Sequence, residues 1–398
     1  MVHADRFTTS KPRLVRPMKI LLCSQNPLDA RLGAAKVLIE LAALLEKLGW
    51  RCRLASNTDI WPGSRGEDSI RATSRFVFAM ARFVERYAKD FDVIDYDQTV
   101  LPFPRSRFEP STLLVARSAL LNYYAKTVRV PQVRGPRALA GAVLRGPVRA
   151  VTRDFNIWLS SRTFDSADLI NVNNDRDRPE LVQRGFDEQK IIVVPLGLTE
   201  ARLAAFAAAA PPAPPTPRVA FVGTFEPRKG ALDFPEIVRQ VTAAVRDCKF
   251  RLLGSRYLDE SRVRAFFSES LRDRLEVIPT YEPDALPGLL RDCSLGVFPS
   301  YYEGFGLGVI EMLAASLPVV AYDVPGPAMI LGSESLVPRG AAAQLAARVV
   351  ELLTDPARLQ AARVRARARA SDFTWERAAK LTSDEYSERV MRLRDATC

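Results

Sequence analysis

The most informative segment of this 398-residue chain is Pro299-Ser300-Tyr301-Tyr302-Glu303-Gly304-Phe305-Gly306-Leu307-Gly308-Val309-Ile310-Glu311. It follows a short apolar run, residues 294–298, which predicts a buried strand. It continues into residues 309–316, whose apolar spacing predicts a helix. The segment is therefore a strand, a glycine-rich loop and a helix, which is the unit that builds parallel α/β sheets.

The glycine-rich loop has the chemistry of a phosphate site. Gly304, Gly306 and Gly308 carry no Cβ, so a ligand can approach the backbone, and the following helix directs free N–H groups to the same place. Glu303 and Glu311 flank the loop, and carboxylates accept hydrogen bonds from sugar and ribose hydroxyls. A nucleotide sugar, with sugar, diphosphate and ribose in series, matches this layout. The structural alternative is a plain turn between two solvated carboxylates.

The pattern around these carboxylates resembles a known family. Glu303, seven residues and Glu311 lie within Pro-Ser-x-x-Glu-Gly-Phe-Gly-Leu, and Leu317-Pro318-Val319-Val320-Ala321 follows. This resembles the retaining glycosyltransferase family 4. The resemblance continues at residues 221–230 (Phe-Val-Gly-Thr-Phe-Glu-Pro-Arg-Lys-Gly), 193–197 and 373–375, and it is densest in the second half of the chain.

The whole chain predicts two domains of one kind. Its length exceeds one ordinary hydrophobic core, and its hydrophobic content of 47% is enough to fill two. Short apolar strands alternate with amphipathic helices in both halves, which is typical of parallel sheets. The expected strands are residues 19–24, 51–56, 92–96, 112–116, 191–194, 218–222, 250–253, 275–278, 296–298 and 319–322, and residues 160–173 are expected to form a helix and a further strand. The resemblance implies the α/β architecture called GT-B, in which two Rossmann-like doubly wound domains face a cleft.

Composition sets the expected domain boundaries. Residues 1–17 are predicted to be a disordered basic arm, and residues 18–200 an N-terminal acceptor domain. Residues 201–217 are rich in Ala and Pro, which favours a linker. Residues 218–372 form the predicted nucleotide-sugar-binding domain. The resemblance implies that a final helix, residues 373–392, packs back on the first domain.

The resemblance also implies a donor site. Arg228 and Lys229 follow the first strand of the second domain, where two cations would neutralise a diphosphate leaving group. Together with Glu303 they are the expected catalytic residues. Glu303 would bind donor-sugar hydroxyls and Glu311 the ribose. The full expected donor-binding set is Gly33, Gly223, Arg228, Lys229, Thr280, Tyr281, Glu303, Gly304, Phe305, Gly306, Leu307 and Glu311. In this set Thr280 and Tyr281 would lie against the base, residues 305–307 would donate backbone N–H groups to the diphosphate, and Phe305 equally fits a core position.

Two positions depart from the family pattern. Many members carry a histidine after the strand at residues 112–116, but the only histidine here is His3, and Arg117 or Ser118 stands at that place. Met329 stands where members often have a glutamate. The resemblance implies front-face transfer, in which the leaving diphosphate accepts the acceptor's proton, so a protein base is not required. The departures leave the donor-sugar and acceptor preference open.

No metal site is expected. Asp95-Tyr96-Asp97 and Asp175-Arg176-Asp177 superficially resemble an Asp-x-Asp metal motif, but we interpret them as a strand-end loop and an N-cap. The resemblance implies metal-independent transfer with no cofactor besides the nucleotide-sugar co-substrate. The five cysteines are far apart and indicate reduced cytoplasmic thiols: Cys23, Cys52, Cys248, Cys293 and Cys398.

The positive charge is concentrated in one segment. The net charge is +11, and residues 110–153 contain eight basic residues and no Asp or Glu. With Tyr123, Tyr124 and Trp158 nearby, this predicts contact with an anionic membrane surface or a charged, lipid-linked glycan. A solvated basic face is the alternative. A second cluster, Arg363, Arg365, Arg367 and Arg369, is interpreted as solvated helix surface.

The sequence therefore predicts a retaining hexosyltransferase that uses a nucleotide-diphosphate sugar and a glycan or lipid-linked acceptor in cell-envelope or exopolysaccharide synthesis. No apolar stretch is long enough to span a bilayer, so we expect a cytoplasmic protein, either free or peripheral at the inner face of the membrane. The alternatives are other GT-B sugar chemistry such as epimerisation, transfer to a small soluble acceptor, and a degenerate GT-B scaffold. Nucleic acid is not an expected partner, because no recognition motif for it is visible.

Overall fold

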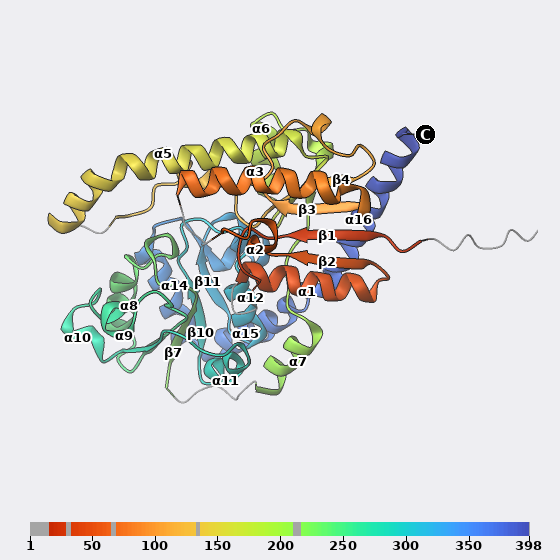
Figure 1. Ribbon diagram of the computed structural model, residues 1–398. Helices are drawn as coiled ribbons and strands as arrows, with labels where there is room; N and C mark the ends of the chain where they lie inside the picture. The colour runs from red at the N-terminus through yellow and green to blue at the C-terminus, as the bar shows by residue number, and fades with distance from the viewer. Residues whose placement is uncertain (1–15, 29–32, 65–68, 133–135, 210–215, 398) are drawn as a thin grey trace, which may run out of the picture.

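A computed structural model describes residues 16–28, 33–64, 69–132, 136–209 and 216–397. Figure 1 shows two lobes, each with a sheet flanked by helices. Most of the predicted basic arm and residues 210–215 of the predicted linker lie outside the described residues. Within the described part, no helix is both long and apolar enough to cross a bilayer.

The first lobe contains a six-stranded parallel sheet in the order β2-β1-β3-β4-β5-β6. Its strands are β1 (Lys19–Cys23), β2 (Arg51–Ala55), β3 (Val93–Asp97), β4 (Leu113–Ser118), β5 (Leu169–Val172) and β6 (Ile191–Val193). Its helices are α1 (Gly33–Lys47), α2 (Asn57–Ile60), α3 (Ile70–Tyr87), α4 (Tyr124–Thr127), α5 (Pro136–Ser166) and α6 (Asp177–Gln183). The strands β1 and β3–β6 are largely buried because helices cover both faces of the sheet, whereas only Ala55 is buried on the edge strand β2.

The second lobe repeats this plan with the order β12-β11-β10-β7-β8-β9. Its strands are β7 (Arg218–Val222), β8 (Lys249–Leu253), β9 (Leu275–Ile278), β10 (Leu295–Phe298), β11 (Val319–Tyr322) and β12 (Leu336–Val337). Its helices are α7 (Glu200–Ala209), α8 (Phe234–Ala244), α9 (Glu260–Arg264), α10 (Glu269–Arg272), α11 (Leu286–Leu290), α12 (Leu307–Ala314), α13 (Pro325–Ile330), α14 (Ala342–Thr354) and α15 (Pro356–Ala370). The strand order reverses between β7 and β10, and ligands of such sheets bind beyond the carboxyl ends at this point.

The last helix, α16 (Trp375–Thr397), joins the two lobes. It packs against α1 and β4 of the first lobe. The Tyr386 hydroxyl donates to Asp95 Oδ2 at 2.7 Å, and Trp50 Nε1 donates to Ser383 Oγ at 2.9 Å. The chain therefore crosses back after completing the second sheet.

Two sequence-based expectations differ from the structure. Residues 201–209, assigned to the linker, belong to α7, which forms because its alanines favour helix and which packs against α11 and α12. Arg363 is not solvated: it is 5% exposed and donates to the carbonyls of Cys293 and Ser294 at 3.1 and 3.3 Å. The interpretation of the cluster as solvated helix surface was therefore wrong for Arg363, whereas Arg365, Arg367 and Arg369 are exposed as expected.

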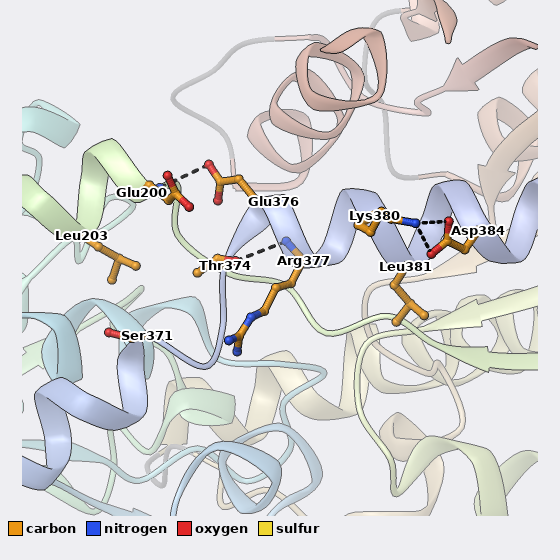
Figure 2. Close-up of a pocket in the computed structure, with 9 residues that line it drawn as sticks. All are labelled: Glu200, Leu203, Ser371, Thr374, Glu376, Arg377, Lys380, Leu381 and Asp384. Carbon is orange, nitrogen blue, oxygen red and sulfur yellow. Dashed lines mark hydrogen bonds and ion pairs between the residues drawn. The ribbon is translucent and has the colours of Figure 1, made fainter. Parts of the chain in front are cut away.

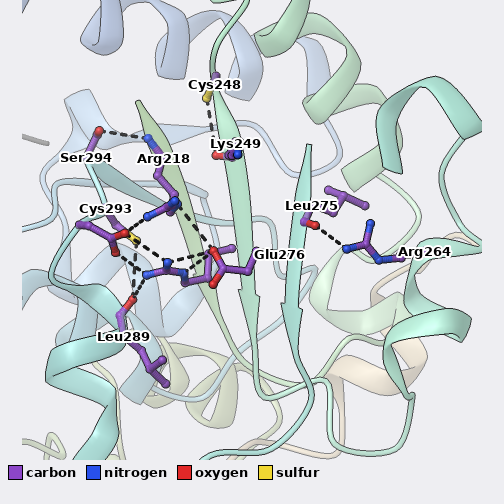
Figure 3. Close-up of polar contacts among 11 residues, drawn as sticks. Arg218, Cys248, Lys249, Arg264, Leu275, Glu276, Leu289, Cys293 and Ser294 are labelled. Carbon is purple, nitrogen blue, oxygen red and sulfur yellow. Dashed lines mark hydrogen bonds and ion pairs between the residues drawn. The ribbon is translucent and has the colours of Figure 1, made fainter. Parts of the chain in front are cut away.

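Charged residues tie the amino-terminal ends of the second sheet together. Arg251 on β8 donates to Glu276 Oε2 on β9 at 2.9 Å, and Arg218 Nε on β7 lies 3.7 Å from the same oxygen. Figure 3 shows Arg218 and Glu276 of this network, and also Arg264, which donates to the Leu275 carbonyl at 2.8 Å. This network lies at the edge away from the carboxyl ends, so it stabilises the sheet and leaves the opposite edge for a ligand.

Candidate active site

The predicted catalytic residues meet where the second sheet reverses its order. Arg228 and Lys229 lie in a 3-10 turn (Pro227–Lys229) just after β7, and Glu303 lies in the loop after β10. Since β7 and β10 are neighbouring parallel strands, their carboxyl ends bring these residues together. The Tyr301 N–H donates to the Arg228 carbonyl at 2.8 Å, which holds the two loops side by side.

Two cations converge on one carboxylate. Lys229 Nζ donates to Glu303 Oε2, and Arg228 Nη1 lies 3.7 Å from the same oxygen. Arg228 Nη2 also donates to Glu226 Oε1 at 2.8 Å. The charges of this group cancel, so an anionic ligand would have to displace a carboxylate from Lys229 or Arg228. The sequence indicated the cations and Glu303, but not that Glu303 and Glu226 pair with these cations.

Each glycine of the loop is required for a different physical reason. Gly306 caps α12 with φ at 100°, a left-handed conformation that favours glycine. A Cβ on Gly308 would lie 2.5 Å from the Val222 carbonyl oxygen, so this glycine lets α12 pack closely on β7. A Cβ on Gly304 would lie 1.7 Å from the Ala119 oxygen of the first lobe. Gly304 is therefore required by the contact between the lobes as well as by any ligand.

Other residues of the loop divide between core and ligand positions. Phe305 is 2% exposed, and its ring centroid lies 5.8 Å from that of Phe373, so its side chain belongs to the core. Leu307 is the first residue of α12. The backbone N–H groups at the start of a helix have no partner within it, and here they lie beside Glu303. This loop can therefore receive an anion through its main chain.

Glu311 lies deeper, on α12. Burial raises the pKa of Glu311, while the nearby positive charges of Lys36 and Arg202 lower it. Burial and the Glu311 carboxylate raise the pKa of Tyr281. The Glu311 surroundings thus come from α1, α7, α12 and the loop after β9. Sequence reasoning missed Lys36 and Arg202, and the only signal for Lys36 was its place one turn after Gly33.

The remaining predicted donor residues line the same edge of the sheet. The Gly223 N–H donates to the Leu253 carbonyl at 2.9 Å, and Thr280 is exposed in the loop after β9. A Cβ on Gly254 would be 3.6 Å from the Tyr281 ring. Gly33 begins α1, whose first turn leads to Lys36 beside Glu311.

Arg117 does not face the cleft as a free cation. It is 8% exposed on β4, donates to Asp95 Oδ1, and donates to Asp97 Oδ1 at 2.9 Å and to the Cys23 carbonyl at 3.2 Å. Its neighbour Ser118 is fully buried. Arg117 therefore stabilises the carboxyl ends of the strands in the first sheet, at the place where the family pattern has a histidine.

The Asp-x-Asp segments have protein partners. Asp95 and Asp97 bind Arg117, and Asp177 accepts a hydrogen bond from the Tyr124 hydroxyl at 2.7 Å. The interpretation of Asp175–Asp177 as an N-cap was wrong, because Arg176 occupies the cap position and the side chain that accepts from the Asp177 N–H is Asn174. Among the residues that the structure describes, no group of three or more His, Cys, Asp or Glu side chains is placed to hold a metal.

A separate hollow of about 680 Å³ lies between α7 and α16. Figure 2 shows that charged side chains line it, with Lys380 bound to Asp384 and the Glu376 carboxylate accepting from the Glu200 N–H at 3.3 Å. Its lining includes none of the predicted site residues. This hollow is therefore separate from the candidate active site at the reversal point of the second sheet.

Comparison with a family model decides the class of the second lobe. Residues 216–355 match the model described as glycosyl transferases group 1. This lobe is a group 1 glycosyltransferase domain. The domain contains β7, β10 and α12, and with them Arg228, Lys229, Glu303 and Glu311.

Relatives by sequence extend the comparison beyond this glycosyltransferase domain. D-inositol 3-phosphate glycosyltransferase of Nocardia farcinica is 30% identical over 284 residues, which are 65% of this chain and 61% of that protein. O-antigen chain mannosyltransferase B of Escherichia coli is 26% identical over 236 residues, 56% of this chain and 61% of that protein. The chain thus spans about three-fifths of the length of these relatives.

Solved structures show the same architecture over nearly the whole chain. Sucrose-phosphate synthase of Thermosynechococcus elongatus superimposes with a TM-score of 0.67 at 20% identity, over 93% of this chain and 98% of its own. HepE of Anabaena, solved with UDP and glucose, superimposes with a TM-score of 0.60 at 16% identity, over 93% and 100%. The predicted GT-B fold of two Rossmann-like lobes is confirmed.

Proposed function

We propose that this protein is a retaining glycosyltransferase that moves a hexose from a nucleotide-diphosphate sugar to a glycan or lipid-linked acceptor. The observation that carries the proposal is the convergence of Lys229, Arg228 and Glu303 beside the start of α12, at the reversal point of a glycosyltransferase domain. Cations and helix N–H groups at one place suit a diphosphate, and an adjacent carboxylate suits sugar hydroxyls.

Donor binding exchanges the partners within this site. The diphosphate takes the place of the carboxylates on Lys229 and Arg228, and this frees Glu303 to accept hydrogen bonds from the sugar. Glu311 binds the ribose hydroxyls, and Tyr281 packs against the base. Lys36, on the first lobe, brings a positive charge to the Glu311 side of the ligand.

The chemistry proceeds on one face of the sugar. The bond from the anomeric carbon to the diphosphate oxygen breaks, and a new bond from the same face to the acceptor oxygen forms. The acceptor's proton passes to the departing nucleoside diphosphate, so no protein base is needed. Lys229, Arg228 and the N–H groups of α12 stabilise the negative charge that develops on the leaving group. These groups supply that stabilisation without a metal ion.

Two named similarities guide the choice of substrates. HepE was solved with UDP and glucose, so UDP-sugars are the first donors to test. The relatives act on an inositol phosphate and on O-antigen chains by name. These names favour a polyhydroxylated acceptor that carries negative charge, and they leave the individual acceptor to experiment.

Thermal shift against UDP, GDP, ADP and their hexose conjugates, each with and without EDTA, tests the donor site. A ligand that binds only the folded protein raises the melting temperature. We expect one nucleotide class to raise it equally with and without EDTA, and Lys229→Met to abolish the rise. Lys249→Met is the matched control, because Lys249 is exposed at the opposite end of the same sheet. If no nucleotide shifts the wild type, the degenerate-scaffold alternative replaces the enzyme.

The surface of α5 supports a second proposal, contact with an anionic membrane. Val148, Val151 and Trp158 are 65%, 58% and 52% exposed, and their spacing places them along one side of the helix. The exposed Arg149 follows Val148 and lies about 100° further around the helix. Exposed apolar residues next to cations suit the interface of an anionic bilayer. The side chains of Arg134, Arg137 and Arg145 lie outside the described residues.

Liposome sedimentation separates membrane contact from a merely basic surface. Vesicles of phosphatidylglycerol and phosphatidylcholine should bind the wild type and lose binding to Trp158→Ser combined with Arg149→Glu. The control, Arg246→Glu with Arg272→Glu, removes two exposed cations of the second lobe and should bind as the wild type does. Equal binding by all three proteins would refute the membrane proposal.

A further inference from the structure

The most direct contact between the lobes lies at the glycine-rich loop. Asn174 follows β5 in the first lobe, and its Nδ2 donates to the Gly304 carbonyl at 2.7 Å. Asn174 is fully buried. A hydrogen bond between buried groups is costly to break because neither group then has a partner in water.

The direction of this amide is fixed by a second hydrogen bond. The Asp177 N–H donates to Asn174 Oδ1 at 3.0 Å, so the NH₂ end of the amide points at Gly304. Asp177 is itself held by the Tyr124 hydroxyl at 2.7 Å. The loop between β5 and α6 therefore presents a donor toward the second lobe.

When the two lobes are in contact, the neighbouring atoms leave no space for a different packing of the glycine-rich loop. A Cβ on Gly304 would meet the Ala119 oxygen at 1.7 Å. At the exposed rim Arg176 Nη1 lies 2.6 Å from Asp323 Oδ1 of the second lobe. The Asn174 bond thus lies at the centre of a close interface with an ion pair at its edge.

We propose that Asn174 is a positioning residue that couples closure of the lobes to the orientation of Glu303; this inference rests on the proposed function. The Glu303 carbonyl accepts from the Gly326 N–H at 3.1 Å within the second lobe, whereas the next carbonyl, that of Gly304, accepts from the first lobe. The backbone of Glu303 is thus fixed from both sides only when the lobes are closed. Closure then directs the Glu303 carboxylate toward the sugar, and opening releases it.

Asn174→Asp tests this role without removing the hydrogen bond that the side chain accepts from the Asp177 N–H. The carboxylate still accepts from the Asp177 N–H, but it presents an acceptor to the Gly304 carbonyl and repels it. Asn57→Asp is the matched control, because Asn57 is 2% exposed and its Nδ2 donates to Ser64 Oγ at 3.0 Å inside its own lobe. Small-angle X-ray scattering and steady-state kinetics are measured on both variants.

We expect Asn174→Asp to enlarge the radius of gyration and to lower kcat by about tenfold or more, with the KM for the donor unchanged. The donor KM is unchanged because the donor-binding groups lie mainly in the second lobe. Asn57→Asp should match the wild type in both measurements. A wild-type radius of gyration and kcat in Asn174→Asp would overturn the inference.

Two further results separate this inference from the proposed function. If the wild type transfers no sugar, the proposed function fails, and the scattering comparison alone then decides the role of Asn174. If Asn174→Asp does not fold, the exposed rim provides the test: Arg176→Asp should enlarge the radius of gyration, and adding Asp323→Arg should restore it. Unchanged scattering in Arg176→Asp would then contradict closure through this interface.

Discussion

Asp177 is the residue whose environment is most unusual for its type. It is fully buried, and its Oδ2 has no hydrogen-bond partner among the described residues. Burial raises the pKa of Asp177 to about 7, although the hydrogen bonds involving Tyr124 and Asn174 act in the opposite direction. The carboxyl group therefore keeps its proton in the folded protein at pH values where it loses it in the unfolded chain.

This difference predicts how stability depends on pH. The pKa of Asp177 is about 7 in the folded protein, and its ordinary value is 3.8. The contribution of Asp177 to the free energy of unfolding is therefore fully present below pH 3.8 and is lost as the pH rises through 7. Between pH 5 and pH 8 the loss is on the order of 2–3 kcal/mol. Urea denaturation of the wild type and Asp177→Asn measures it. As the pH rises, the unfolding free energy of Asp177→Asn should increase relative to that of the wild type. Parallel pH profiles of the two proteins would contradict the raised pKa of Asp177.

The residues of the second-lobe motif were accessible to sequence reasoning, because strand, loop and helix chemistry is local. The resemblance to a family motif marked Glu303, Lys229 and Glu311, and the rule that parallel strands end at one edge predicts that the loops carrying Glu303 and Lys229 lie together. Asn174 and Lys36 were not accessible, because they reach the same place from the other lobe and nothing in their own neighbourhoods marks them.

At the scale of elements, apolar strands gave the clearest signal. The ten strands expected with stated bounds correspond to β1–β4 and β6–β11, with ends that differ by a residue or two, and the further strand expected within residues 160–173 corresponds to β5. β12 has only two residues and escaped notice, since so short a run carries no periodicity. Buried strands were predictable because they are apolar throughout.

Helices depended more on tertiary contacts. α7 was not predicted, because the prolines that follow it favoured a linker, although its alanines favour helix. α5 extends over 31 residues and continues through Pro147, a residue that disfavours a helix interior, so its full length was not predictable from local sequence. On α15 the interior position of Arg363 could not be predicted, because a guanidinium enters a core only where free carbonyls, here those of Cys293 and Ser294, receive it.

At the scale of the whole molecule, the two lobes meet through contacts of different kinds. α16 packs on the first sheet, and Tyr386 joins the buried Asp95 and Arg117 group. On the cleft side the contact is narrower and runs through Asn174 and Gly304. We infer that α16 keeps the lobes attached while the Asn174 contact opens and closes.

The central claim is transfer of a hexose with retention from a nucleotide-diphosphate sugar. The most direct test is ¹H NMR of the hexose released from an α-linked sugar nucleotide of the class that raises the melting temperature, recorded before the anomers equilibrate. The account predicts that α-hexose forms first, without added metal, and that Lys229→Met releases none. Formation of β-hexose first, or no consumption of any sugar nucleotide that the protein binds, would contradict it.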